Sequence, residues 1–167
     1  MKAIIQRVNE ASVKIDQEIY ASINQGLLVF IGIESGDTND DGDWLVSKIS
    51  QLRIFSDENE KMNLSLIDKR WQILIISQFT LIADTRKGNR PSFIRAAKGQ
   101  EAISLYEAFV DKFTTLLDKP CTISEPGNPV SNQPMRKVFT GIFGADMQVS
   151  LINNGPVTIE IDTRNKN

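Results

Sequence analysis

Two apolar stretches, Leu27-Leu28-Val29-Phe30-Ile31-Gly32-Ile33 and Gln72-Ile73-Leu74-Ile75-Ile76-Ser77-Gln78-Phe79, decide the predicted fold. A continuous apolar run of this length is typical of a strand that is buried on both faces. The glycine inside the first run suggests a bulge or a close approach of another backbone segment. We therefore expect two central strands in a sheet that is covered on both sides.

Shorter segments around these two strands predict the remaining elements. Further strands are expected at residues 3–8, 11–15, 19–23, 52–55, 136–139, 146–152 and 157–162. Helical spacing of apolar residues predicts amphipathic helices over 39–52 and 100–117. The polar pair Asn9-Glu10 is expected to be a tight connection, and Asn153-Asn154-Gly155-Pro156 a turn between the last two strands.

The order of these elements predicts an α+β fold, because strands and helices do not alternate as βαβ units. We expect curved or barrel-like mixed sheets with two main helices packed outside, in a single domain spanning 1–167. Residues 119–134 hold four of the six prolines. This stretch is therefore interpreted as a surface insertion and not as a domain linker.

The composition is that of a folded domain, with 41% hydrophobic and 24% charged residues. No apolar run approaches the ~20 residues that a membrane-spanning helix needs. Polar residues follow Met1 too soon for a signal peptide, so we expect a cytoplasmic protein without a membrane partner. The net charge of −2 argues against a general nucleic-acid coat, yet it is compatible with a local basic site.

The sequence has no histidine and a single cysteine, Cys121. This excludes a Ser-His-Asp or Cys-His hydrolase, a His-ligated zinc centre and a histidine general base. The acidic run 40–43 lacks the ligand spacing of a calcium loop and suits the first turn of a helix. We expect no metal and no cofactor, so an enzyme must rely on other side chains, backbone dipoles or a group of its substrate.

Three segments are candidates for a functional site. Ser77, Gln78, Phe79 and Thr80 end a buried strand, where polar side chains and free backbone amides reach a common surface. Such a cluster also commonly satisfies backbone groups that leave a strand, and no histidine activates Thr80 as a nucleophile.

The second candidate is the segment 85–98, which contains five cations and no acidic residue: Arg86, Lys87, Arg90, Arg95 and Lys98. Clustered arginine and lysine favour contacts with nucleic-acid phosphates. The alternative is a solvated charged loop. The third candidate is the segment 153–158, which contains Gly155-Pro156; the alternative is that it serves only as a turn. Upstream of it, the glycine-rich segment 140–147 suggests a tight backbone approach.

The motifs occur in the order found in D-aminoacyl-tRNA deacylases, and the chain resembles that family over essentially its whole length. The resemblance rests mainly on Gln6-Arg7-Val8, Ser77-Gln78-Phe79-Thr80-Leu81, Lys87-Gly88-Asn89-Arg90-Pro91-Ser92-Phe93 and Asn153-Asn154-Gly155-Pro156-Val157-Thr158. Three further segments, 55–57, 61–63 and 145–151, also look like the family.

The resemblance implies a homodimer that hydrolyses the ester between a D-amino acid, or mischarged glycine, and the terminal adenosine of tRNA; no DNA partner is expected. In the family, the Gly-Pro of the last turn is cis and enters the partner's active site, where its carbonyls exclude an L side chain. That role carries over to Gly155-Pro156. Arg7 is similar to the arginine that holds this turn, in contact with the methionine matched by Met147. The segment 77–80 matches the motif that lines the pocket.

An aminoacyl ester is already activated, and the ribose 2′-hydroxyl can assist the attack of water. Backbone amides at Phe79 or Thr80 then suffice to stabilise the oxyanion. Arg86, Lys87 and Arg90 are the cations expected to contact tRNA. Ile142 departs from the family, which usually has an arginine there. A non-catalytic tRNA-acceptor or nucleotide-binding module and a threonine-dependent esterase for small esters are the alternatives.

Overall fold

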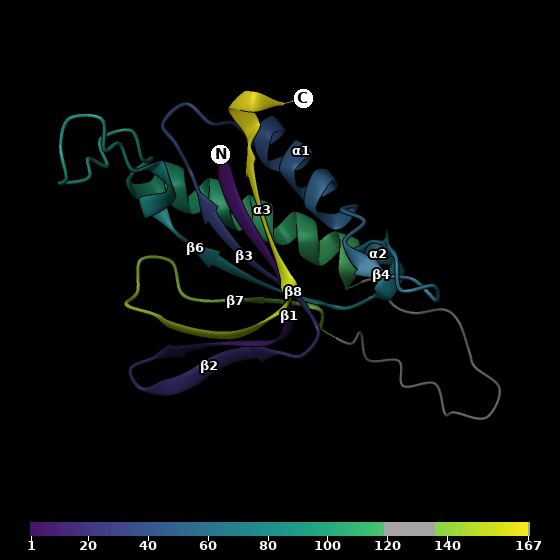
Figure 1. Cartoon of the computed structure of the whole chain (residues 1–167). Helices are drawn as coiled ribbons and strands as arrows, with labels where there is room; N and C mark the ends of the chain where they lie inside the picture. Colours follow the sequence, from purple (N-terminus) through teal and green to yellow (C-terminus); the bar gives the residue numbers. More distant parts are fainter. Residues whose placement is uncertain (119–135, 167) are drawn as a thin grey trace.

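The computed structural model describes residues 1–118 and 136–166, and Figure 1 shows its strands and helices. The strands of the main sheet are β1 (Lys2–Ile15), β2 (Glu18–Ile23), β3 (Gly26–Gly32), β6 (Gln72–Ser77), β7 (Val138–Thr140) and β8 (Gln148–Asp162). A small hairpin consists of β4 (Phe55–Ser56) and β5 (Met62–Leu64). The helices are α1 (Asn39–Ser50), α2 (Leu66–Lys69) and α3 (Gly99–Leu117), with 3₁₀ turns η1 (Phe79–Ile82) and η2 (Thr163–Asn165).

The main sheet is mixed and curls until it is nearly closed into a barrel. Its strand order is β2-β1-β3-β6-β7. β3 pairs with residues 2–8 of β1 and β2 with residues 11–15, while β8 pairs with β1 along both parts. β1 runs antiparallel to β2, β3 and β8, whereas β3, β6 and β7 are mutually parallel. The α+β fold with two main helices outside the sheet is therefore confirmed, and α2 adds a single further turn.

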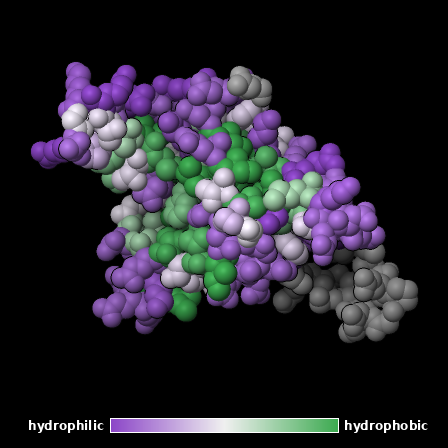
Figure 2. Space-filling view, viewed as in Figure 1, coloured by the Kyte–Doolittle hydropathy of each residue, from purple (hydrophilic) through white to green (hydrophobic). Residues whose placement is uncertain are grey.

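The two central strands are buried on both faces, as their sequences predict. Leu27 and Ile73 point into the core beneath α1 and α3, whereas Leu28 and Leu74 point into the core inside the curled sheet. Because successive side chains of a strand alternate in direction, strands with both faces covered need continuous apolar sequences. On the outer surface, apolar residues gather over the middle of the face in Figure 2, with hydrophilic residues around them.

Two predicted connections are wrong. Asn9 and Glu10 continue β1, which stays paired with β8 there, with Glu10 opposite Ile152. Both residues are polar because they are exposed on the strand. Residues 153–156 do not separate two strands, because β8 continues through them with a bulge at residues 154–157. In both places polar residues on a solvated strand resemble a turn in sequence.

Two smaller differences concern the ends of elements. The strand predicted at 52–55 is reduced to Phe55–Ser56, and Phe79 begins η1 instead of ending β6. The expected close backbone approach at Gly32 is present, because a Cβ there would lie 3.0 Å from the Gln78 carbonyl oxygen and 2.9 Å from the Leu81 Cβ atom. The predicted insertion at 119–134 lies outside the described residues. Among the helices of 1–118 and 136–166, none is long and apolar enough to cross a membrane.

Candidate active site

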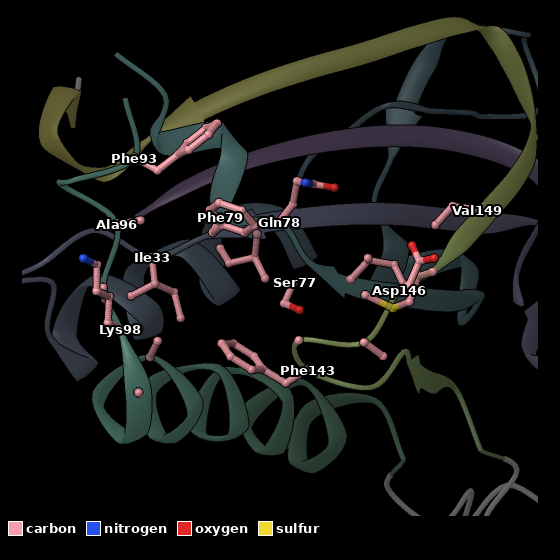
Figure 3. Close-up of a pocket in the computed structure, with 18 residues that line it drawn as sticks. Ile33, Ser77, Gln78, Phe79, Phe93, Ala96, Lys98, Phe143, Asp146 and Val149 are labelled. Carbon is pink, nitrogen blue, oxygen red and sulfur yellow. The ribbon is translucent and has the colours of Figure 1, made fainter. Parts of the chain in front are cut away.

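A cavity of about 500 Å³ opens where β6 ends, between the start of α3 and the segment 143–149 (Figure 3). Of the residues predicted to form the pocket, Ser77, Gln78 and Phe79 line it. Thr80 does not: its hydroxyl is exposed and accepts a hydrogen bond of 2.6 Å from the Gln78 side-chain amide. The structure thus brings three of the four predicted residues to one cavity.

The end of β6 turns toward this cavity in a defined way. The Gln78 N–H donates to the Ile31 carbonyl at 2.7 Å, which extends the β3–β6 pairing to the cavity's edge. The chain then enters η1, and the first N–H groups of a helix have no partner within it. The backbone amides of Phe79 and Thr80 lie at this start of η1, next to the cavity.

Aromatic rings form opposite walls of the cavity. Phe79 is 57% exposed and meets Phe93 edge-on, with ring centroids 5.1 Å apart. Phe143 packs on Tyr106 at 5.5 Å, and the Tyr106 hydroxyl donates to the Ile75 carbonyl at 2.9 Å. Burial raises the pKa of Tyr106, which keeps this phenol protonated as a donor. Flat apolar walls of this kind suit a planar or apolar group of a ligand.

Two charged residues, Lys98 and Asp146, lie at opposite ends of the cavity in Figure 3. Sequence reasoning gave neither of them a place in the pocket, although Lys98 belongs to the basic segment. The glycines of 140–147 were a usable signal. A Cβ at Gly141 would collide with the Met147 sulfur and lie 3.2 Å from the Ile76 Cδ1 atom, so glycine there lets this segment close onto β6.

The Gly155–Pro156 peptide bond is cis, and it lies in the β8 bulge opposite Arg7. The Arg7 guanidinium donates from Nε to the Asn154 carbonyl at 2.9 Å and from Nη1 to the Ile54 carbonyl. The described hydrogen bonds of Arg7 go to residues 54 and 154. Met147 lies on the cavity wall, and its contact with Arg7 stays a prediction. Neither Gly155 nor Pro156 lines the cavity of its own chain.

Residues 84–92 form a loop that contains Arg86, Lys87 and Arg90, called the basic loop. Asp84 and Ser92 close it, because their backbones exchange hydrogen bonds of 2.8 and 2.9 Å. Arg86 forms an ion pair with Asp84, one residue before the segment that contains no acid. Hydrogen bonds from Arg86 hold the pKa of the Asp84 carboxyl well below its usual range. Lys87 and Arg90 are exposed, with no described ion pair, so they are better placed than Arg86 to meet a phosphate.

Within the described ranges, no group of three or more potential ligands is arranged to hold a metal ion.

The model of the family described as D-Tyr-tRNA(Tyr) deacylase matches residues 4–162. The chain belongs to this family. Curated relatives named D-aminoacyl-tRNA deacylase include proteins of Flavobacterium psychrophilum, 54% identical, and Cytophaga hutchinsonii, 51% identical, each aligned over 99% of both chains.

Solved structures give the same result for the fold. A structure described as c-Myc DNA unwinding element binding protein is 37% identical, with a TM-score of 0.82 over 97% of this chain and 98% of that one. A structure of a probable eukaryotic D-amino acid tRNA deacylase has a TM-score of 0.74 over 96% of this chain and 98% of that one. At 18% identity, the second likeness supports the family's fold alone.

Proposed function

We propose that this chain is a D-aminoacyl-tRNA deacylase that hydrolyses the ester between a D-amino acid, or mischarged glycine, and the 3′-terminal adenosine of tRNA. The observation that supports this most strongly is the cavity at the end of β6. Its aromatic walls adjoin the start of η1, in a chain whose residues 4–162 match a deacylase family. A substrate used in translation is consistent with the expected cytoplasmic location.

The proposed chemistry uses the start of η1, at the edge of the cavity. The backbone amides of Phe79 and Thr80 stabilise the negative charge that develops on the carbonyl oxygen of the ester when water attacks. The ribose 2′-hydroxyl of the substrate assists that attack, since the chain has no histidine to act as a base. Ser77 and Gln78 position the ester, and the Thr80 hydroxyl takes no covalent part.

Chiral selection requires a second copy of the chain. Gly155 and Pro156 are exposed and lie outside the cavity of their own chain. In a two-fold symmetric homodimer, this loop enters the partner's cavity, where its fixed carbonyls collide with an L side chain but not with a D side chain or glycine. Arg7 braces the loop by holding Asn154.

The basic loop contacts the phosphates of the tRNA acceptor end. Lys87 and Arg90 supply the free charges, and Arg86 shapes the loop through Asp84 while adding a weaker contact. The loop is connected directly to Phe93 on the cavity wall, so phosphate contacts here would orient the terminal adenosine toward the site.

Incubation of the protein with D-tyrosyl-tRNA, L-tyrosyl-tRNA and glycyl-tRNA tests the proposal, with release of the amino acid as the readout. We expect loss of the D-tyrosyl and glycyl esters at rates far above spontaneous hydrolysis, with the L-tyrosyl ester preserved. Release from none of the three would refute the enzymatic function and favour a binding module. Equal release of D- and L-tyrosine would refute chiral selection and favour a general esterase.

A further inference from the structure

The Gly155–Pro156 loop interrupts the pairing of two long strands. Along β1 and β8, the register passes from Gln6 opposite Thr158 directly to Val8 opposite Asn153. Residues 154–157 therefore stand opposite Arg7 alone, without the regular ladder. Backbone groups in such a bulge need other partners, particularly where the chain returns to the interior.

The Asn153 side chain supplies these partners. The Val157 N–H donates to Asn153 Oδ1 at 2.8 Å, and Asn153 Nδ2 donates to the Val157 carbonyl at 3.1 Å. Nδ2 also lies 3.2 Å from the Thr158 hydroxyl. Val157 is only 8% exposed, so water is a poor substitute for these bonds. One amide thus takes the place of a strand partner and closes residues 153–157 into a loop.

The other end of the loop is anchored separately. Arg7 holds the Asn154 carbonyl, and Asn154 Nδ2 donates to Asn9 Oδ1 at 2.6 Å. Gly155 lies between the two anchors: a Cβ there would be 2.9 Å from Arg7 Nη2 and 2.8 Å from Val157 Cγ2. Its φ of +136° also suits glycine. The path of the loop is therefore fixed from both sides.

We propose that Asn153 is a positioning residue that sets the discrimination between D- and L-aminoacyl-tRNA. This inference rests on the proposed role of the Gly155–Pro156 loop in the partner's cavity. Asn153 touches no substrate; it holds the return of the loop, so that the excluding carbonyls stay at their positions. Loss of the Asn153 hydrogen bonds should admit L substrates before it affects hydrolysis itself. Ser77 and Phe79, which act on the ester, lie in a separate part of the fold.

The test compares kcat/KM for D- and L-tyrosyl-tRNA in full-length variants. Asn153→Ala removes both bonds to Val157, whereas Asn153→Asp keeps the acceptor for the Val157 N–H and loses the donor. Asn24→Ala, the same change at an exposed residue before β3, is the matched control. Thermal unfolding is measured for each variant, and if Asn153→Ala does not fold, the near-isosteric Asn153→Asp decides the result.

Asn153→Ala should raise the L/D ratio of kcat/KM by about tenfold or more, and Asn153→Asp by less, while Asn24→Ala leaves it unchanged. Pro156→Ala, measured in parallel, separates the two proposals. If Pro156→Ala relaxes discrimination and the folded Asn153 variants do not, the inference about Asn153 is wrong and the role of the loop stands. If Pro156→Ala leaves discrimination intact, the proposed role of the loop fails, and the inference fails with it.

Discussion

Replacement of Thr80 by alanine distinguishes the proposed mechanism from covalent catalysis. The Thr80 hydroxyl is exposed, lies outside the cavity lining and accepts one hydrogen bond from Gln78. A neutral hydrogen bond contributes about 0.5–1.5 kcal/mol. Since 1.36 kcal/mol corresponds to tenfold in rate, Thr80→Ala should lower the rate of D-tyrosyl-tRNA hydrolysis by about tenfold at most.

A nucleophile would behave very differently. Removal of the catalytic serine of a serine hydrolase lowers kcat on the order of 10⁶-fold. Single-turnover hydrolysis of D-tyrosyl-tRNA with excess enzyme measures the chemical step without product release. Thr80→Ser restores a hydroxyl at the same position, and Thr85→Ala is a matched change at an exposed threonine of the basic loop.

A loss of more than about 10³-fold in Thr80→Ala, restored by Thr80→Ser and with KM unchanged, would refute the reasoning. It would show that the hydroxyl attacks the ester despite the absence of a histidine. Comparable rates for Thr80→Ala, Thr80→Ser and Thr85→Ala would agree with catalysis by backbone amides and the substrate's own hydroxyl.

Three further predictions concern the basic loop, the end of β3 and acid stability. Lys87→Gln should reduce the slope of log K for tRNA binding against log salt by about 0.7–0.9, and Arg86→Gln by less, because Arg86 is already paired; equal slopes would contradict this. Gly32→Ala should lower the free energy of unfolding by about 1–3 kcal/mol and slow hydrolysis, because the added methyl group displaces η1. An unchanged denaturant midpoint would contradict this, since it would show that Leu81 moves aside without cost. The hydrogen bond with Lys166 lowers the pKa of Asp41 to about 2 from 3.8, so its stabilisation is present above pH 4 and is lost as the pH falls toward 2. Asp41→Asn should remove up to about 1 kcal/mol of that acid dependence in unfolding curves, and identical curves would contradict it.

The parts of the fold that the sequence predicts are those set by local pattern. Continuous apolar runs predict β3 and β6 because strands covered on both faces have no polar side to show. Asn9 and Glu10 mislead for the opposite reason: their side chains face solvent on a strand that remains paired. A local pattern cannot tell a polar turn from the wet face of a strand.

The site is only partly predictable for a related reason. Ser77, Gln78 and Phe79 are found because they end a recognisable strand. Asp146 joins them across about seventy residues of chain, and only the folded sheet brings the two segments together. The ion pair of Arg86 with Asp84 is not evident from the composition of 85–98, because Asp84 lies one residue before that segment. The proximity of Arg7 to residue 154 was expected only from the resemblance to the family, since nothing local in the sequence links these two positions.

The central claim is that the loop of one copy completes the cavity of the other, and mixed dimers test it most directly. Phe79→Pro removes a backbone amide at the first position of η1, where proline is tolerated, and so disables the cavity while leaving the loop intact. Pro156→Ala keeps the cavity but weakens the loop. The two variants are unfolded together and refolded with Phe79→Pro in large excess, so that nearly every Pro156→Ala chain has a Phe79→Pro partner.

The measurement is the hydrolysis of L-tyrosyl-tRNA by this mixture, compared with Pro156→Ala alone at the same concentration. If the loop acts in the partner's cavity, the mixed dimers should stop hydrolysing L-tyrosyl-tRNA and continue to hydrolyse D-tyrosyl-tRNA. If mixed dimers form and L-tyrosyl-tRNA is still hydrolysed at the rate of Pro156→Ala alone, the loop does not act across the dimer and the claim is contradicted.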